Sequence, residues 1–366
     1  MASIQIKTPS AEYTVTLGSG LLRTLRQRIQ RALGGGTLPR VFFITSQEIW
    51  AKWSDRATES FDGATVLFVP PGERFKRLPT VERLLEELAR AGADRDSVII
   101  AFGGGVIGDM AGFIAAIYMR GIRCVQVPTT LLAQVDSSVG GKTGANLAAG
   151  KNLVGSFHHP IAVISDVDVL STLPKQELRA GLQESVKSGI IRDARLFAYL
   201  EKNAKAVLRG DTKALAYVVE RSVRVKADVV NQDERESGLR MILNFGHTIG
   251  HAIEAATNYK QLLHGEAIGW GMIAAVRLAQ ARGAIAEKDA QRIVKLAHVY
   301  GPLPRFTATA EKLVRLSASD KKNRGGARRF ILPTGIGTVE IVKDVTEEEL
   351  LAACEQMLGE VKRARR

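Results

Sequence analysis

The stretch Ser97–Asp109, SVIIAFGGGVIGD, decides the fold, because an apolar run passes directly into a glycine-rich turn and then into an apolar helical pattern. The turn satisfies G-x-G-x-x-G, which lets backbone N–H groups approach a pyrophosphate at a helix N-terminus. The pattern alone is weak, because no acidic ribose ligand stands about 20 residues further on, in Gln126–Thr129. Glu73, after an earlier strand pattern, is expected to take that role. The alternative is a tight strand-to-helix turn that binds no ligand.

Apolar runs alternate with helical patterns around this turn, which is typical of a parallel sheet with crossover helices. Strands are expected at 41–45, 65–69, 97–102 and 122–127, with helices at 79–91 and 106–118. After about Leu170, helices are expected at 175–208, 212–230, 247–256 and 266–281, and a hairpin at 329–332 and 338–342. We predict an α/β protein, with a Rossmann-like parallel-sheet domain over 1–170 and a mainly α-helical domain over 171–366.

Length and composition fit a two-domain globular protein. The 366 residues are 45% hydrophobic and 24% charged, and the chain is longer than one core usually organises. No targeting segment is visible, and the longest apolar helix candidate, Met110–Met119, is too short to span a bilayer. Cys124 and Cys354 have no metal-type spacing, which fits a reducing compartment. A cytoplasmic location without a membrane partner is therefore expected.

The net charge of +13 raises the alternative of a protein that binds nucleic acid. Basic residues are spread along the chain, with dense groups only at 321–324, 328–329 and 362–366. The last group is expected to be a solvated chain end. An anionic small-molecule substrate explains the internal basic residues equally well, so we expect no nucleic-acid partner.

Three of the six histidines, His247, His251 and His264, fall close together in sequence with a helical pattern. His247 and His251 share a helix face, and His264 would open the following helix. Imidazole suits zinc, and a catalytic zinc keeps three protein ligands and one open position. The alternative is a set of polar helix residues with satisfied hydrogen bonds. The third histidine and the acidic neighbours favour a metal site.

The most specific stretch is Pro128–Gly144, PTTLLAQVDSSVGGKTG, followed by Gly150–Gly155, GKNLVG. It is not a P-loop, because Asp136 stands where G-x-x-x-x-G-K-[ST] requires its first glycine. The stretch resembles the 3-dehydroquinate synthases, a family within the sugar-phosphate cyclases. Further family-like motifs follow in the expected order, at 103–109, 118–121, 184–187, 240–254, 264–267 and 320–326.

The resemblance implies conversion of 3-deoxy-D-arabino-heptulosonate 7-phosphate to 3-dehydroquinate and phosphate, the second step of the shikimate pathway to chorismate. NAD would be reduced and restored within each turnover. Glu184, His247 and His264 would bind zinc or cobalt, and His251 would serve the substrate's phosphate and proton traffic beside the metal. The resemblance also implies a homodimer in which Arg120 reaches the site of the second subunit.

The same resemblance assigns roles to the remaining motif residues. The catalytic residues would be Asp136, Lys142, Lys187 and His251. The substrate-binding residues would be Arg120, Lys142, Lys151, Asn152, Lys226, Arg240, Asn244, Lys321 and Lys322. The cofactor-binding residues would be Glu73, Gly104, Gly105, Val106, Asp109, Thr129, Thr130, Lys142, Lys151, Thr172, Leu173 and Glu177. Any one of these basic residues, taken alone, is better interpreted as a solvated surface charge.

Three positions depart from the family pattern. Gln183 and Ser188 lie on either side of the Glu184–Lys187 motif, so the surroundings of the metal are expected to differ. Ser46 stands where an Asn or Asp is usual near the adenosine. The rival function is a metal-dependent NAD alcohol dehydrogenase of the glycerol dehydrogenase type, which shares the architecture but needs fewer phosphate-binding cations.

Overall fold

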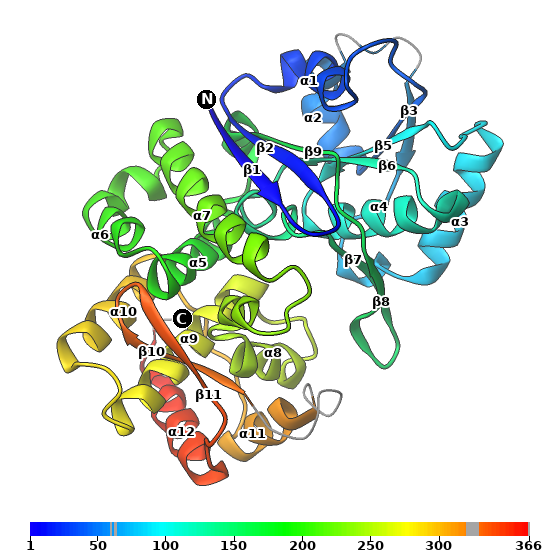
Figure 1. The fold of residues 1–366 in the computed structure, drawn as a ribbon. Coiled ribbons are helices and arrows are strands. Elements are labelled where there is room, and N and C mark those ends of the chain that lie inside the picture. Colours follow the sequence, from blue (N-terminus) through cyan, green and yellow to red (C-terminus); the bar gives the residue numbers. More distant parts are fainter. Residues whose placement is uncertain (59–60, 62–63, 320–328, 365–366) are drawn as a thin grey trace. The chain divides into compact units, whose positions relative to one another are not determined.

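The computed structural model describes residues 1–58, 61, 64–319 and 329–364, which form two compact units (Figure 1). The first unit comprises Met1–Leu173 with Leu215–Asn231, and the second comprises Pro174–Ala214 with Gln232–Arg366. Within the described residues, no helix combines the length and the apolar character needed to cross a membrane.

A seven-stranded sheet in the order β1-β2-β9-β6-β5-β3-β4 forms the centre of the first unit. Its strands are β1 (Ala2–Lys7), β2 (Glu12–Gly18), β3 (Val41–Thr45), β4 (Thr65–Phe68), β5 (Val98–Gly103), β6 (Arg123–Pro128) and β9 (Ala162–Asp166). The β1–β2 pair is antiparallel and the other pairs are parallel. The chain order reverses between β3 and β5, so ligands are expected outside the carboxyl ends of these two strands.

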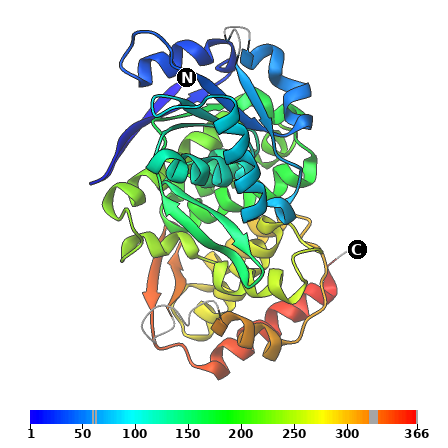
Figure 2. The same cartoon turned by 90° about the vertical axis from the view of Figure 1, so that its right-hand side faces the viewer.

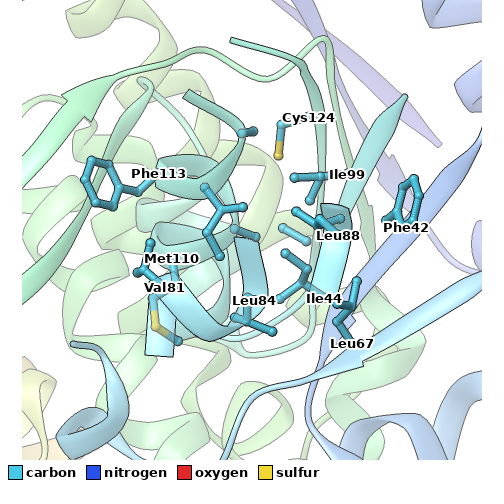
Figure 3. Packing of buried hydrophobic residues seen from close by; sticks show 14 of the residues in the cluster. Phe42, Ile44, Leu67, Val81, Leu84, Leu88, Ile99, Met110, Phe113 and Cys124 are labelled. Carbon is cyan, nitrogen blue, oxygen red and sulfur yellow. The ribbon is translucent and has the colours of Figure 1, made fainter. Parts of the chain in front are cut away.

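Crossover helices α2 (Gln47–Thr58), α3 (Leu78–Arg90) and α4 (Gly105–Ile117) join the parallel strands, and α1 (Leu25–Ala32) precedes β3. Leu84 and Leu88 of α3 and Met110 of α4 are fully buried against Ile99 of β5 (Figure 3). Burying a side chain of this size contributes roughly 1.5–3 kcal/mol. This packing fixes the place where β5 ends and the glycine turn begins.

The four strands predicted from residue 41 to residue 127 are confirmed as β3, β4, β5 and β6, within one residue at each end. Two hairpins are not predicted by the sequence patterns. The β1–β2 hairpin joins the sheet because β2 pairs with β9, and β7 (Lys142–Leu147) pairs with β8 (Gly150–Phe157). The β7–β8 hairpin packs on α4 (Figure 2). Its strands carry glycines at close backbone contacts rather than alternating apolar residues, so periodicity does not reveal them.

Helix α7 (Thr212–Gln232) departs from the predicted division, which assigned every residue after 170 to the second domain. Residues 215–231 of this helix belong to the first unit. There, Lys226 pairs with Asp136, and Asn231 accepts a hydrogen bond from the backbone N–H of Lys7. Helical periodicity shows that an apolar face exists, but it does not show which core buries that face.

The second unit is mainly helical and is organised around α9 (His264–Ala281). Its other helices are α5 (Lys175–Ile191), α6 (Ala194–Leu208), α8 (His247–Ala256), α10 (Glu287–Val299), α11 (Ala310–Ser319) and α12 (Glu347–Arg363). Helices α5, α8, α10 and α12 all pack on α9, which is buried along most of its length.

Two further predictions for this unit can be compared with the structure. The helix predicted over 175–208 is two helices, because the Asp193 carboxylate accepts hydrogen bonds from the N–H groups of Arg195 and Leu196 and caps α6. The predicted hairpin is confirmed as the antiparallel pair β10 (Phe330–Gly335) and β11 (Thr338–Val342).

Candidate active site

Glu184, His247 and His264 lie together in the second unit. The Nε2 atom of each histidine is 3.6 Å from Glu184 Oε1. Three possible ligand atoms, one from each residue, all lie within 4.8 Å of one another. The Glu184 side chain is 1% exposed. Lys187 pairs with its Oε2, but its Oε1 has no hydrogen-bond partner within the described part of the chain. Leaving a buried carboxylate oxygen without such a partner is costly. Two imidazoles and one carboxylate therefore fit a divalent metal such as zinc.

Two glycines allow the helices that carry these ligands to approach closely. Gly265, beside His264, lies so near the carbonyl of Ala180 on α5 that a Cβ would overlap its oxygen. Gly271 lies in the same way against the carbonyl of Gly246, at the start of α8. These contacts hold α9 against α5 and α8, and thereby bring the three predicted ligands together.

Hydrogen bonds on the opposite ring nitrogens orient both imidazoles. His247 Nδ1 is 3.1 Å from the Phe245 carbonyl oxygen, and His264 Nδ1 is 3.4 Å from Glu254 Oε2. We assign the protons to Nδ1, since both oxygens are acceptors, and this leaves Nε2 of each ring facing Glu184. Glu254 is buried and was missed by sequence reasoning. Glu254 could have been predicted from its position three residues after His251, which places both side chains on one face of the helix.

Burial and charge set the protonation of this cluster. Burial lowers the pKa of His247 to about 3, and the nearby Lys187 acts in the same direction. Burial also opposes the charge on His264, but the neighbouring carboxylates of Glu184 and Glu254 raise its pKa to about 10. For Glu184, Lys187 and the imidazoles outweigh burial and hold the pKa well below its usual range. Because metal ligands bind in deprotonated form, an ion would displace a proton here.

Lys187 and His251 border the three ligands. The Lys187 ammonium is buried and forms an ion pair with Glu184. The His251 ring centroid is 5.3 Å from that of His247 and 6.0 Å from that of His264. Both predicted catalytic residues of this unit thus lie at the cluster.

The two departures near the metal motif bond to backbone groups. The Gln183 amide donates to the carbonyl oxygen of Ala297 at 2.9 Å. The Ser188 hydroxyl donates to the backbone carbonyl of Glu184 at 2.9 Å. Neither of these two hydrogen bonds involves a side-chain atom of Glu184, His247 or His264.

The segment after α7 carries Arg240 and Asn244. Burial opposes the charge on Asp233, but hydrogen bonds from the backbone N–H groups of Ser237, Gly238 and Arg240 outweigh it and lower the pKa to about 2. These bonds fold the segment tightly enough to bury Arg240. The Asn244 amide donates to Glu236 Oε1 at 2.5 Å. Glu236 has a left-handed φ of 61°, a strained conformation of the kind that gathers at functional sites.

In the first unit, the glycine turn after β5 lies against the segment that follows β6. Thr129 N–H donates to the Gly103 carbonyl at 3.0 Å, and a Cβ on Gly104 would lie 2.9 Å from Thr130 Cγ2. Helix α4 begins at Gly105, so its N-terminal N–H groups lie at this turn. The structure brings together the predicted cofactor residues Gly104, Gly105, Val106, Thr129 and Thr130.

A buried lysine that sequence reasoning missed joins several predicted residues. Lys76 Nζ is 2.5 Å from both Asp109 Oδ2 and Asn152 Oδ1. Asn146 donates to Glu73 Oε1 at 2.7 Å and accepts from the N–H of Asn152 at 2.8 Å. Two predicted cofactor residues and one predicted substrate residue are thus linked. The available signal was a lysine three residues after Glu73, near the carboxyl end of β4.

Asp136 and Lys226 form an ion pair in the first unit. Asp136 lies in a π-helical turn, a feature frequent at functional sites, and its Oδ1 is 2.5 Å from Lys226 Nζ. The same ammonium donates to the Asp136 carbonyl at 2.6 Å. Lys142 opens β7 and is exposed, and Lys151 lies half-buried on β8.

The remaining predicted residues are more scattered. The Thr172 hydroxyl accepts a hydrogen bond from Trp53 Nε1 at 3.1 Å, so it anchors α2. Leu173 ends the first unit, whereas Glu177 lies in the first turn of α5 in the second. The Ser46 hydroxyl, directly after β3, accepts from the N–H of Ile49. Exposed Arg120 has a left-handed φ of 70°. Lys321 and Lys322 lie outside the described residues.

Comparisons with known proteins agree with this geometry. Residues 66–180 match the family model of 3-dehydroquinate synthase N-terminal, and residues 181–323 match 3-dehydroquinate synthase C-terminal. A 3-dehydroquinate synthase from Koribacter versatilis is 46% identical over 361 residues, covering 98% of each chain. The one from Solibacter usitatus is 44% identical over 362 residues, covering 98% of this chain and 100% of the relative.

Solved structures extend the likeness to the fold. A 2-deoxy-scyllo-inosose synthase in complex with carbaglucose-6-phosphate, NAD+ and Co2+ has a TM-score of 0.87 at 28% identity, covering 97% of this chain and 99% of its own. A 2-epi-5-epi-valiolone synthase from Streptomyces hygroscopicus with NAD+ and Zn2+ has a TM-score of 0.86 at 28% identity, covering 96% and 98%.

The Rossmann-like unit and the His-His-Glu cluster of the helical unit define the class, that of the sugar-phosphate cyclases. Within this class, the chain belongs to the 3-dehydroquinate synthase family and is a carbon–oxygen lyase. The predicted family, fold class and function are confirmed, and the predicted cofactors agree with those of the two complexes. A probable glycerol dehydrogenase from Sinorhizobium meliloti shares the fold alone, with a TM-score of 0.67 at 15% identity, covering 96% of this chain and 98% of its own. The rival dehydrogenase function therefore has only distant support.

Proposed function

We propose that the chain converts 3-deoxy-D-arabino-heptulosonate 7-phosphate to 3-dehydroquinate and phosphate, with NAD reduced and reoxidised within each turnover. This reaction is the second step of the shikimate pathway to chorismate and the aromatic amino acids. One observation carries the proposal above all others. Glu184, His247 and His264 offer ligand atoms within 4.8 Å of one another in a chain 46% identical to a 3-dehydroquinate synthase.

The two cofactors would supply the redox chemistry. Glu184, His247 and His264 would hold a divalent metal, which lowers the pKa of a substrate hydroxyl and polarises the ketone formed from it. The glycine turn after β5 would hold NAD, which would supply reversible hydride transfer. Lys187, ion-paired with Glu184, holds that carboxylate in its charged, ligating form.

Asp136 and Lys142 would act beside the nicotinamide. Lys226 bonds both the side chain and the backbone carbonyl of Asp136, which fixes the carboxylate in one orientation. An ionised carboxylate can accept the proton of the hydroxyl that is oxidised. This pairing gives Lys226 an orienting role in addition to its predicted contact with the substrate carboxylate.

Departure of the phosphate requires cations and hydrogen-bond donors on the leaving group. Lys76 donates to Oδ1 of Asn152, which orients the amide so that its nitrogen is the donor offered to the substrate. The other proposed phosphate ligands are Arg120, Lys142, Asn244 and His251. Lys151, Lys226 and Arg240 would bind the substrate carboxylate, and Lys321 or Lys322 keeps the predicted role of closing over the substrate.

The test is phosphate release from the heptulosonate phosphate with NAD present, measured before chelation, after it and after zinc is restored. Absorbance follows net NADH in the same samples. We expect phosphate release that depends on the metal and leaves no NADH behind. NADH that accumulates with a simple polyol, without phosphate release, would identify a dehydrogenase instead.

We also propose that the chain acts as a cytoplasmic homodimer in which Arg120 reaches the partner's site. Ile117 and Met119, beside Arg120, are 42% and 45% exposed, and Leu153 and Phe157 on one face of β8 are 54% and 42% exposed. Helix α4 and the β7–β8 hairpin pack together, so these apolar side chains lie on adjoining elements. Gathered exposed apolar residues are typical of interaction surfaces.

Subunit mixing tests this arrangement. Arg120→Ala and His264→Ala are each expected to be inactive alone. Mixed dimers regain activity if the intact arginine of one subunit serves the intact metal site of the other. A monomer by light scattering under active conditions, or no recovery after mixing, would contradict the proposed dimer.

A further inference from the structure

A tyrosine of the N-terminal hairpin is bonded to the loop that carries the proposed catalytic groups of the first unit. Tyr13, at the start of β2, is 3% exposed. Its hydroxyl oxygen accepts a hydrogen bond from the Gly140 N–H at 3.1 Å, across 127 residues of sequence. Gly140 lies between Asp136 and Lys142. We infer that Tyr13 is a positioning residue, which sets the geometry of the Asp136–Lys142 loop through this bond.

The loop needs support because it has little stiffness of its own. Gly140 and Gly141 have left-handed φ values of 99° and 68°, a conformation that glycine adopts without steric cost. Two successive glycines directly before Lys142 supply no side chain that could anchor the turn. Its backbone must be fixed by other elements. Tyr13 bonds the N–H of Gly140, and the N–H of His158 donates to the Gly141 carbonyl at 2.8 Å.

The ring of His159 supports the same turn. A Cβ on Gly141 would lie 3.0 Å from His159 Cγ, so the imidazole packs directly on the glycine backbone. The ring centroids of His159 and Tyr13 are 5.7 Å apart, with the rings tilted by 45°. Both residues are anchored by the sheet, because β2 pairs with β9 just after each of them, with Thr14 opposite Ala162. The Gly140–Gly141 turn is thus fixed by residues that lead into two paired strands.

This arrangement gives the N-terminal hairpin a role in catalysis without a group at the reacting atoms. The inference rests on the proposed function, because it takes Asp136 and Lys142 as reacting groups. A displacement of about 1 Å in such a group can cost on the order of 10²-fold in rate. The hydroxyl of Tyr13 would limit that displacement.

The test is Tyr13→Phe, which keeps the ring and removes the bond to Gly140. We expect kcat for phosphate release to fall on the order of tenfold, because one buried hydrogen bond is lost and the freed N–H distorts the turn. The metal content should stay that of the wild type. A purely structural role would lower the unfolding midpoint and leave kcat per folded chain unchanged.

His159→Ala probes the same turn from its other contact, and it also serves if Tyr13→Phe folds poorly. We expect it to lower kcat as well. The double variant should lose less than the product of the two single losses, because both act through one turn. Independent effects that multiply in full would contradict the shared mechanism.

Tyr300→Phe is the matched control. Tyr300 is fully buried in the second unit, and its hydroxyl donates to the Leu200 carbonyl at 2.9 Å. We expect this variant to lose stability and to keep its kcat. If Tyr13→Phe loses no more kcat than Tyr300→Phe, the inference is overturned while the proposed function stands. If the wild-type protein itself releases no phosphate, the proposed function fails instead.

Discussion

The Glu184–His247–His264 cluster of the second unit and the Lys76 and Lys226 ion pairs of the first unit balance their charges in different ways. In the cluster, Lys187 pairs with one oxygen of the buried Glu184, whereas Oε1 has no hydrogen-bond partner within the described residues. In the first unit, charged side chains pair with one another, Lys76 with Asp109 and Lys226 with Asp136, each at 2.5 Å. On the proposed function, a bound cation would complete the first site, whereas protein groups alone balance the second.

This difference predicts which property a substitution in each region should change. A change in the cluster should be felt mainly in metal binding and activity, because the ion completes the site. A change in the paired lysines should be felt in folding stability as well, because it leaves the partner carboxylate unbalanced. Substitutions at His264, Lys76 and Glu254 test whether the two regions differ in this way, and one at Asp233 tests a buried carboxylate outside both regions.

The largest expected effect is that of His264→Ala. Loss of one of three ligands should remove the metal, and with it several kcal/mol of transition-state stabilisation, on the order of 10³-fold or more in kcat. Metal analysis and phosphate release measure this. His298→Ala, another histidine of the same unit, should keep both metal and activity. A fully active His264→Ala variant without metal would remove the basis of the comparison.

Lys76→Met tests the paired region. The Lys76 side chain is 4% exposed and that of Asp109 is 23% exposed, so the variant should lose about 3 kcal/mol in the free energy of unfolding. Urea unfolding measures this loss. In the matched control, Arg90→Met removes an exposed pair with Glu86 and should cost less than about 0.5 kcal/mol. Equal losses of unfolding free energy in the two variants would show that the buried ion pair stabilises the fold no more than the exposed one.

Glu254→Leu and Glu254→Gln sharpen the account of the cluster. Leucine removes the acceptor for His264 Nδ1, and metal affinity should fall by roughly 10–100-fold. Glutamine keeps an acceptor and should lose less. Competition with a chromophoric chelator measures the affinities, and Glu266→Gln, a buried glutamate on α9, serves as the control. An unchanged affinity in Glu254→Leu would mean that packing alone orients the imidazole.

The smallest expected effect is that of Asp233→Asn, which depends on pH. The folded-state pKa of Asp233 is lowered to about 2, below its unfolded value of about 3.9. The stabilisation is therefore fully present above about pH 4 and is lost as the pH falls through about 2. At pH 7 the variant should be less stable by about 1 kcal/mol, and the difference should shrink on acidification. Asp55→Asn, an exposed change on α2, is the matched control.

The sequence could predict those parts of the site that depend on local pattern. His247 and His264 stand at the first positions of two helices, and Gly104 follows a continuous apolar strand, so spacing alone indicates their neighbourhoods. Family motifs supplied Glu184, whose place on a helix has no distinctive periodicity. These are the features that the structure brings together as expected.

The sequence could not predict residues whose importance comes from contacts between distant segments. Lys76 meets Asn152 across 76 residues, and Tyr13 meets Gly140 across 127. Glu254 lies near His251 in sequence, yet it contacts His264, which follows a turn. The sequence does not specify the direction in which the chain leaves that turn. Each contact depends on how strands and helices are arranged in space, which local patterns do not specify.

Because most of α7 belongs to the first unit, this helix limits which segments related enzymes can exchange by recombination, in evolution or in engineering. The chain changes unit after Leu173, after Ala214 and after Asn231. A single genetic crossover near residue 170 would take Asp136 from one parent and Lys226 from the other. A working chimera needs residues 215–231 from the same parent as residues 1–173. We therefore expect that crossovers within this coding sequence rarely give a working protein when the two parents are distantly related.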